Sequence, residues 1–199
     1  LLRAELALKT NHPREAVSLA ERSRGLAEKA GDTYEAARAF RVLAAAARNS
    51  GDADRAEDLL TEGVRILREI ETPFPLALAL LDLGRLAVDR LTLRSDVDRV
   101  LLHLEEALRL FRGLGIERGR GEALLALARA HVRTGAFDRA AAFLAEATGI
   151  FRGMDMPEAL TMVGEVQSEI EGRFVEESVS HLNEFRATTR IQEILDARV

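Results

Sequence analysis

The sequence has 199 residues, which suits one globular domain or one short helical-repeat array, and 47% of them are hydrophobic while only 5% are aromatic. Its 28 basic and 33 acidic residues are interspersed and give a net charge of −5, without the basic stripe of a nucleic-acid-binding protein. The absence of cysteine excludes disulfides and thiolate sites, and no apolar run approaches the ~18 residues that span a bilayer. We therefore expect a cytoplasmic protein without direct contact to nucleic acid or membrane. The chain begins without methionine and ends inside a predicted helix, so we also expect it to be part of a longer protein.

Four amphipathic segments recur along the chain at intervals of 40, 44 and 40 residues. Each starts at a small or β-branched anchor, and the four anchors are Ala16, Ala56, Val100 and Ala140. Four residues later stand Ala20, Leu60, Leu104 and Leu144. Further apolar residues follow ten and fourteen positions after each anchor, and these offsets form one face of a helix with 3.6 residues per turn. The sequence thus predicts four copies of one amphipathic helix.

A different amphipathic segment precedes the later copies and recurs once more after the last copy. It carries a small residue beside leucine or valine, which lets two helices approach closely, at Ala44, Gly84, Ala128 and Gly164. Short turns with glycine, asparagine, aspartate or proline separate the two kinds of helix. The "DRLTLRSD" segment at 89–96 adds one turn to the longest interval. The predicted antiparallel helix pairs cover residues 1–31, 33–72, 74–115 and 118–155, with a half pair at 157–171.

This pattern resembles the tetratricopeptide repeat family from residue 1 to about residue 171. The resemblance is carried by "LLDLG" at 80–84, "TMVG" at 161–164 and the spacing of Gly135, Phe137 and Ala140. Its helices are longer than usual, and a period near 40 is similar to elongated variants in bacterial multidomain signalling and transcription regulators. The resemblance implies an all-α, right-handed solenoid of antiparallel helix pairs over residues 1–172.

Residues 173–199 form a separate predicted segment, because the repeat pattern stops there. The segment lacks glycine and proline and is long enough for one helix. Two interpretations remain open. A capping helix covers the last repeat, because the end of a solenoid must hide its apolar face. Alternatively, a linker helix dimerises two chains and leads into a further domain.

No group of residues in the sequence converges on a catalytic or metal-binding chemistry. The four histidines, His12, His103, His131 and His181, show no spacing that places two imidazoles on one helix face. His131 occupies the position that related repeats give to tyrosine, so we expect a core histidine. The glycine-rich "GLGIERGRGE" at 113–122 lacks the lysine and hydroxyl residue of a phosphate loop. We therefore expect no enzyme activity, no cofactor and no metal.

The inward-facing positions of the first helix of each pair predict a binding groove, because solenoids of this kind bind along their concave side. The predicted groove is basic at first and then apolar with arginines, and its candidate residues are Arg38, Arg41, Arg48, Leu78, Leu81, Arg85, Val88, Leu125, Arg129, Val132 and Arg133. Arginines held on helices pair well with carboxylates, and an apolar strip accepts one face of a helix. The alternative is that arginine stems cover apolar surface and that neighbouring helices bury the strip.

These features favour a non-catalytic scaffold or sensor module that binds a protein or peptide segment with hydrophobic anchors and acidic flanks. The segment can belong to a partner or to the same polypeptide, and residues 173–199 are the candidate for a homodimer contact. We expect the module to be part of a larger bacterial signalling or transcription regulator. A domain that senses a small molecule and a structural or dimerisation arm are the alternatives.

Overall fold

The computed structural model describes residues 1–90 and 97–173. The predicted extra turn falls mainly on residues 91–96, and the predicted capping or linker helix falls on residues 174–199. Both lie outside the described residues, so the choice between capping and dimerisation stays open.

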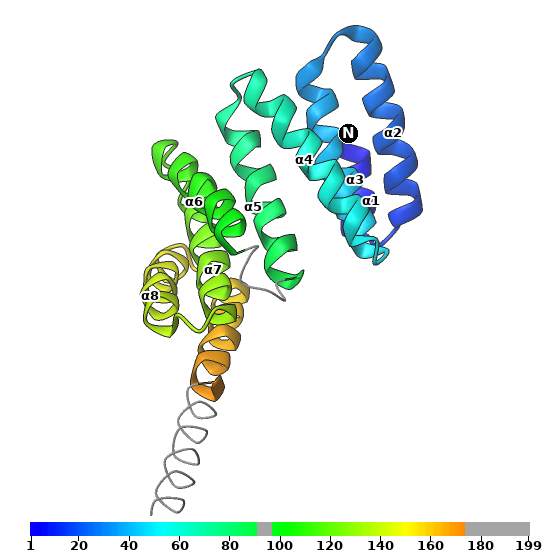
Figure 1. Ribbon diagram of the computed structural model, residues 1–199. Helices are drawn as coiled ribbons and strands as arrows, with labels where there is room; N and C mark the ends of the chain where they lie inside the picture. Colours follow the sequence, from blue (N-terminus) through cyan, green and yellow to red (C-terminus); the bar gives the residue numbers. More distant parts are fainter. Residues whose placement is uncertain (91–96, 174–199) are drawn as a thin grey trace, which may run out of the picture.

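The described residues form helices and no strand, which confirms the all-α fold class. Consecutive helices pack against each other in antiparallel pairs, and the chain adds one pair after another (Figure 1). The helices are α1 (Leu2–Lys9), α2 (Pro13–Ala30), α3 (Thr33–Asn49), α4 (Ala53–Glu69), α5 (Pro73–Arg90), α6 (Val97–Gly113), α7 (Glu117–Arg133), α8 (Phe137–Gly153) and a further helix over 157–173.

The turns between helices share one backbone feature. Each of the seven described turns contains one residue with positive φ, and these residues are Asn11, Gly31, Gly51, Glu71, Gly115, Gly135 and Asp155. A left-handed residue ends a helix and redirects the chain within two or three residues. Asp32 and Asp52 then start the next helix, since their carboxylates accept the backbone N–H of Glu35 and Arg55 at 3.0 and 3.1 Å.

The stack of pairs bends so that the first helices lie on its concave side. The Cα atoms of α1 and α3, of α3 and α5, and of α5 and α7 come within 8 Å of each other. The second helices α2, α4, α6 and α8 have no such backbone contacts with one another. Because the first helices are closer together than the second helices, the array curves around them.

The repeated stripe of the second helices forms the core. All four anchors are at most 1% exposed, and the residues four positions later are at most 4% exposed. The later positions of the stripe are less buried. Leu26, ten positions after its anchor, is 59% exposed, and Leu114 and Met154, fourteen positions after theirs, are 39% and 43% exposed.

One of the small residues in the first helices permits a very close helix contact. A Cβ atom added to Gly84 would lie 2.3 Å from Cδ2 of Leu104, and Leu104 is fully buried, so it has no space to move. The close approach of two helices that this small residue predicts is therefore present between α5 and α6. At Gly164, which holds the equivalent position in the last helix, an added Cβ meets no atom of the described residues within 4 Å.

We predict that Gly84→Ala lowers the free energy of unfolding by about 1–3 kcal/mol, because the added methyl group overpacks the α5–α6 contact. Gly25→Ala is the matched control, since Gly25 also lies inside a helix but its added Cβ has nothing within 4 Å. This control should be more stable than the parent by about 0.5–1 kcal/mol. Urea unfolding followed by circular dichroism measures both values, and equal effects of the two substitutions would contradict this account.

Candidate functional site

The concave face carries a ladder of ion pairs, each of which joins one first helix to the next. We call these four pairs the concave ladder, and they are Glu5–Arg38 at 3.5 Å, Arg41–Asp82 at 2.7 Å, Arg85–Glu122 at 3.2 Å and Arg129–Glu165 at 3.7 Å. The predicted groove arginines Arg38, Arg41, Arg85 and Arg129 thus already contact carboxylates of the same chain. Neighbouring first helices lie close enough for an arginine on one to reach an acidic residue on the next.

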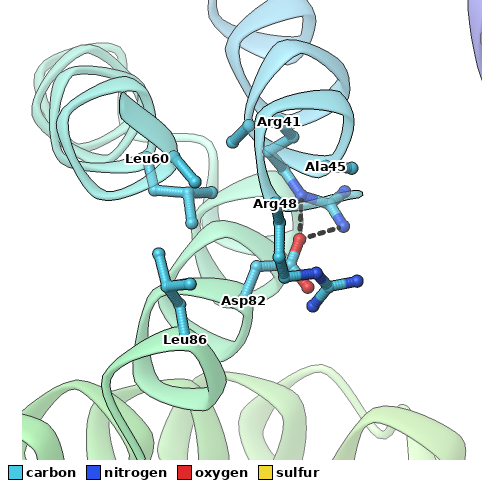
Figure 2. A pocket seen from close by; sticks show the side chains of 8 residues that line it. Arg41, Ala45, Arg48, Leu60, Asp82 and Leu86 are labelled. Carbon is cyan, nitrogen blue, oxygen red and sulfur yellow. Dashed lines mark hydrogen bonds and ion pairs between the residues drawn. The ribbon is translucent and has the colours of Figure 1, made fainter. Parts of the chain in front are cut away.

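The Arg41–Asp82 pair is the best-formed member of the concave ladder. The Nε and Nη2 atoms of Arg41 both donate to Oδ2 of Asp82, at 2.8 and 2.7 Å, and each side chain is 29% exposed (Figure 2). Ala45, Leu60 and Leu86 line the small cavity beside this pair. Its volume of about 50 Å³ has room for water but not for a ligand.

Two predicted groove arginines remain exposed and form no ion pair with the described residues. Arg48 lies in the last turn of α3, beside Arg41 and Asp82 (Figure 2). Arg133 is the last residue of α7 and lines none of the hollows described below. Arg48 is therefore the predicted arginine that is both on the concave face and available to a partner.

Two larger hollows lie on either side of the Arg41–Asp82 pair. The first, which we call the N-terminal hollow, has a volume of about 570 Å³ between α1, α3 and α5, and its lining includes Leu8, Lys9, Tyr34, Phe74 and Leu78. The second, the C-terminal hollow, has about 480 Å³, and its lining includes Arg48, Val88, Leu125, Arg129, Met156 and Met162. Both have the size of typical ligand sites.

The predicted apolar strip is divided between these hollows and the core. Leu78 lines the N-terminal hollow, and Val88 and Leu125 line the C-terminal hollow. Leu81 and Val132 are only 1% and 0% exposed and line neither hollow, so the prediction that they face the groove is wrong. Both residues belong to the hydrophobic core. For this part of the apolar strip, the alternative interpretation applies, in which neighbouring helices bury it.

Several residues that line the hollows are not among the predicted groove residues. Tyr34 and Phe74 are 38% and 44% exposed, and Met162 is 36% exposed. Tyr34 and Phe74 lie at the beginning of α3 and α5, before the groove residues that were predicted in these helices. A signal was present, because both aromatic residues lie four positions before a predicted groove residue of the same helix, Arg38 or Leu78.

Burial lowers the pKa of two histidines in the described helices. His131 is 4% exposed and stacks on Phe143 with ring centroids 5.4 Å apart, as expected for a core histidine. Burial, and then the charge of Arg139, lower the pKa of His131. Burial, and then Arg99, lower the pKa of His103. Within residues 1–90 and 97–173, no group of three histidine or acidic side chains is placed to hold a metal ion.

These features define a helical-repeat solenoid with a hollowed concave face. Residues 103–164 match the family model of the tetratricopeptide repeat, so this part of the chain carries that repeat. No protein of curated function matches the sequence. In the described ranges, no helix combines the length and the apolar composition that a membrane crossing requires.

Two crystal structures share this fold. BtubC (BKLC) from P. vanneervenii is 20% identical, with a TM-score of 0.66 over 78% of this chain and 63% of that chain. Aspartyl phosphate phosphatase F from Bacillus subtilis is 11% identical, with a TM-score of 0.75 over 92% of this chain and 47% of that chain. The chain thus spans about half to two thirds of the length of these proteins. At such identities the similarity concerns the fold alone.

We predict that the Arg41–Asp82 pair stabilises the contact between α3 and α5. A double-mutant cycle with Arg41→Ala and Asp82→Ala should give a coupling energy of about 0.5–1.5 kcal/mol, which decreases at high salt. The control cycle on Arg65 and Glu69, an exposed pair within α4, should give about 0.3–0.5 kcal/mol. Urea unfolding provides all values. A coupling energy near zero for Arg41 and Asp82 would show that this pair adds nothing to stability.

We predict that His131 makes the folded state less stable in acid. Its pKa is lowered in the folded state, so the unfolded state takes up a proton first as the pH falls below the ordinary histidine pKa of about 6.5. The free energy of unfolding should therefore decrease from pH 8 downward through the folded pKa. His131→Phe keeps an apolar ring on Phe143 and should show a smaller decrease between pH 8 and pH 5.5 than the parent. Parallel profiles of the two proteins would rule out this role of His131.

Proposed function

We propose that this chain is a non-catalytic scaffold that binds a protein segment along its concave face. Tetratricopeptide repeats generally bind protein or peptide partners. The observation that carries the proposal for this chain is the pair of hollows between successive first helices, each lined by apolar side chains that remain accessible. An extended or helical segment lying along the concave face can place one side chain in each hollow.

The charges of the concave face support a contact that is largely apolar. Four of the six predicted arginines take part in the concave ladder, so their charges are balanced by the carboxylates of the chain itself. Arg48 lines the C-terminal hollow together with Asp89 and Glu158, and none of the three forms an ion pair with the described residues. A partner that fits this face therefore has hydrophobic anchor residues and a carboxylate that can reach Arg48.

We further propose that the module is part of a larger bacterial regulator. The support is the repeat length near 40 residues and the similarity in fold to Aspartyl phosphate phosphatase F from Bacillus subtilis, of which the chain spans 47%. In such a protein the bound segment is either a separate partner or another part of the same polypeptide. The concave face offers the same hollows to both.

We predict that peptides selected from a random display library bind the concave face. The double variant Leu78→Glu/Met162→Glu places a charge in each hollow. It should weaken the binding of the selected peptides by at least about tenfold, or ~1.4 kcal/mol. Leu102→Glu on α6 is the control, because Leu102 is 59% exposed and lines neither hollow. Fluorescence anisotropy gives the affinities, and circular dichroism verifies that both variants fold.

The control should bind the selected peptides as the parent does. Equal binding by the parent and by the concave double variant would overturn the proposed function, and so would a selection that yields no peptide at all.

A further inference from the structure

Two exposed aromatic side chains occur in the described part of the chain, and both line the N-terminal hollow. Tyr34 is 38% exposed and Phe74 is 44% exposed, whereas every other aromatic residue among residues 1–90 and 97–173 is more buried. They come from different helices, Tyr34 from α3 and Phe74 from α5. Aromatic side chains that stay accessible beside a hollow are a feature of interaction sites, because they bury much apolar area when a partner binds.

The ring of Tyr34 is held in place by the surrounding charges. The guanidinium group of Arg38 lies over the ring, 5.7 Å from its centroid. Arg38 in turn donates to Glu35 at 2.6 Å and to Glu5 of α1 at 3.5 Å. Because these contacts join α1 and α3, the ring has support from both helices that form this side of the hollow.

The backbone of Phe74 is restricted by its two neighbours. Pro73 and Pro75 flank it in the first turn of α5, and the pyrrolidine ring fixes φ at both positions. Leu8, Val42 and Leu78 provide the apolar lining that continues inward from Phe74. The N-terminal hollow is thus largely formed before a partner arrives, so little conformational entropy is lost on binding.

One cation in the lining of the N-terminal hollow forms no ion pair with the described residues. The cations of this lining are Lys9, Arg38 and Arg41, and its carboxylates are Glu5 and Asp82. The two arginines pair with the two carboxylates in the concave ladder. Lys9, the last residue of α1, is exposed and forms no ion pair with the described residues. A carboxylate of a partner can therefore approach Lys9 without displacing a contact of the chain.

We infer that the N-terminal hollow is the primary anchoring site for a partner segment that presents a large apolar side chain next to a carboxylate. The apolar side chain lies between Tyr34 and Phe74 and contacts Leu78, and the carboxylate pairs with Lys9. This inference rests on the proposed function and assigns its main contact to one of the two hollows. The C-terminal hollow has one exposed apolar side chain, Met162, and serves as the second contact.

The test uses the full chain and synthetic peptides with a photoreactive benzoylphenylalanine at the centre. One peptide has glutamate on both sides of this residue, and the other has lysine. After irradiation, mass spectrometry locates the crosslinks. We expect the glutamate peptide to label residues 5–9, 34–45 and 74–82, and to label them at least fivefold more strongly than the lysine peptide does. Labelling confined to the C-terminal hollow would overturn this inference and leave the proposed function intact.

Three variants test the named residues. Tyr34→Ser/Phe74→Ser should lose most of the labelling of the N-terminal hollow, whereas Leu102→Ser on α6 should keep it. Lys9→Glu should reverse the preference, so that the lysine peptide labels more strongly than the glutamate peptide. A reversal of preference cannot result from unfolding, which would weaken both peptides. An unchanged preference in Lys9→Glu would overturn the assigned charge contact.

Discussion

The backbone contacts between successive first helices, α1 with α3, α3 with α5 and α5 with α7, are the constraint on which the other features depend. The second helices lack such contacts, so the array bends around the first helices and gives the chain a concave face. Two hollows lie on this face, and the Arg41–Asp82 pair lines both the N-terminal hollow and a separate cavity of about 50 Å³. The helix contact therefore decides both the shape of the surface and the places at which it is accessible.

The concave ladder links this geometry to electrostatics. A spacing that brings neighbouring first helices together also brings an arginine on one within reach of a carboxylate on the next, as at Arg85 and Glu122. Such pairs stabilise each junction modestly, because they are only partly shielded from water. They also leave Lys9 and Arg48 as exposed cations at separate places, without an ion pair among the described residues. For the proposed partner segment, we therefore expect the position of a carboxylate to matter more than total negative charge.

The sequence predicts the repeated part of the structure well, because periodicity is a local property. The anchors at Ala56 and Val100 are buried as their spacing requires, and the all-α solenoid follows from the alternation of two amphipathic patterns. The site is less predictable because it depends on three helices at once. Helical periodicity alone did not distinguish Leu78, which lines a hollow, from Leu81, which the adjacent helices bury completely. Likewise, the pairing of Arg41 with Asp82 joins residues 41 positions apart.

The strength of a single anchor limits how a partner can bind. Burying one large apolar side chain contributes about 1.5–3 kcal/mol, and one ion pair at an exposed lysine adds at most ~1 kcal/mol. Together these reach at most the ~4 kcal/mol that corresponds to millimolar affinity, and the entropy of association must still be subtracted. A segment held only between Tyr34 and Phe74 would dissociate quickly. Useful affinity therefore requires that the same segment also reaches the C-terminal hollow, because contacts made by one continuous segment act at high effective concentration.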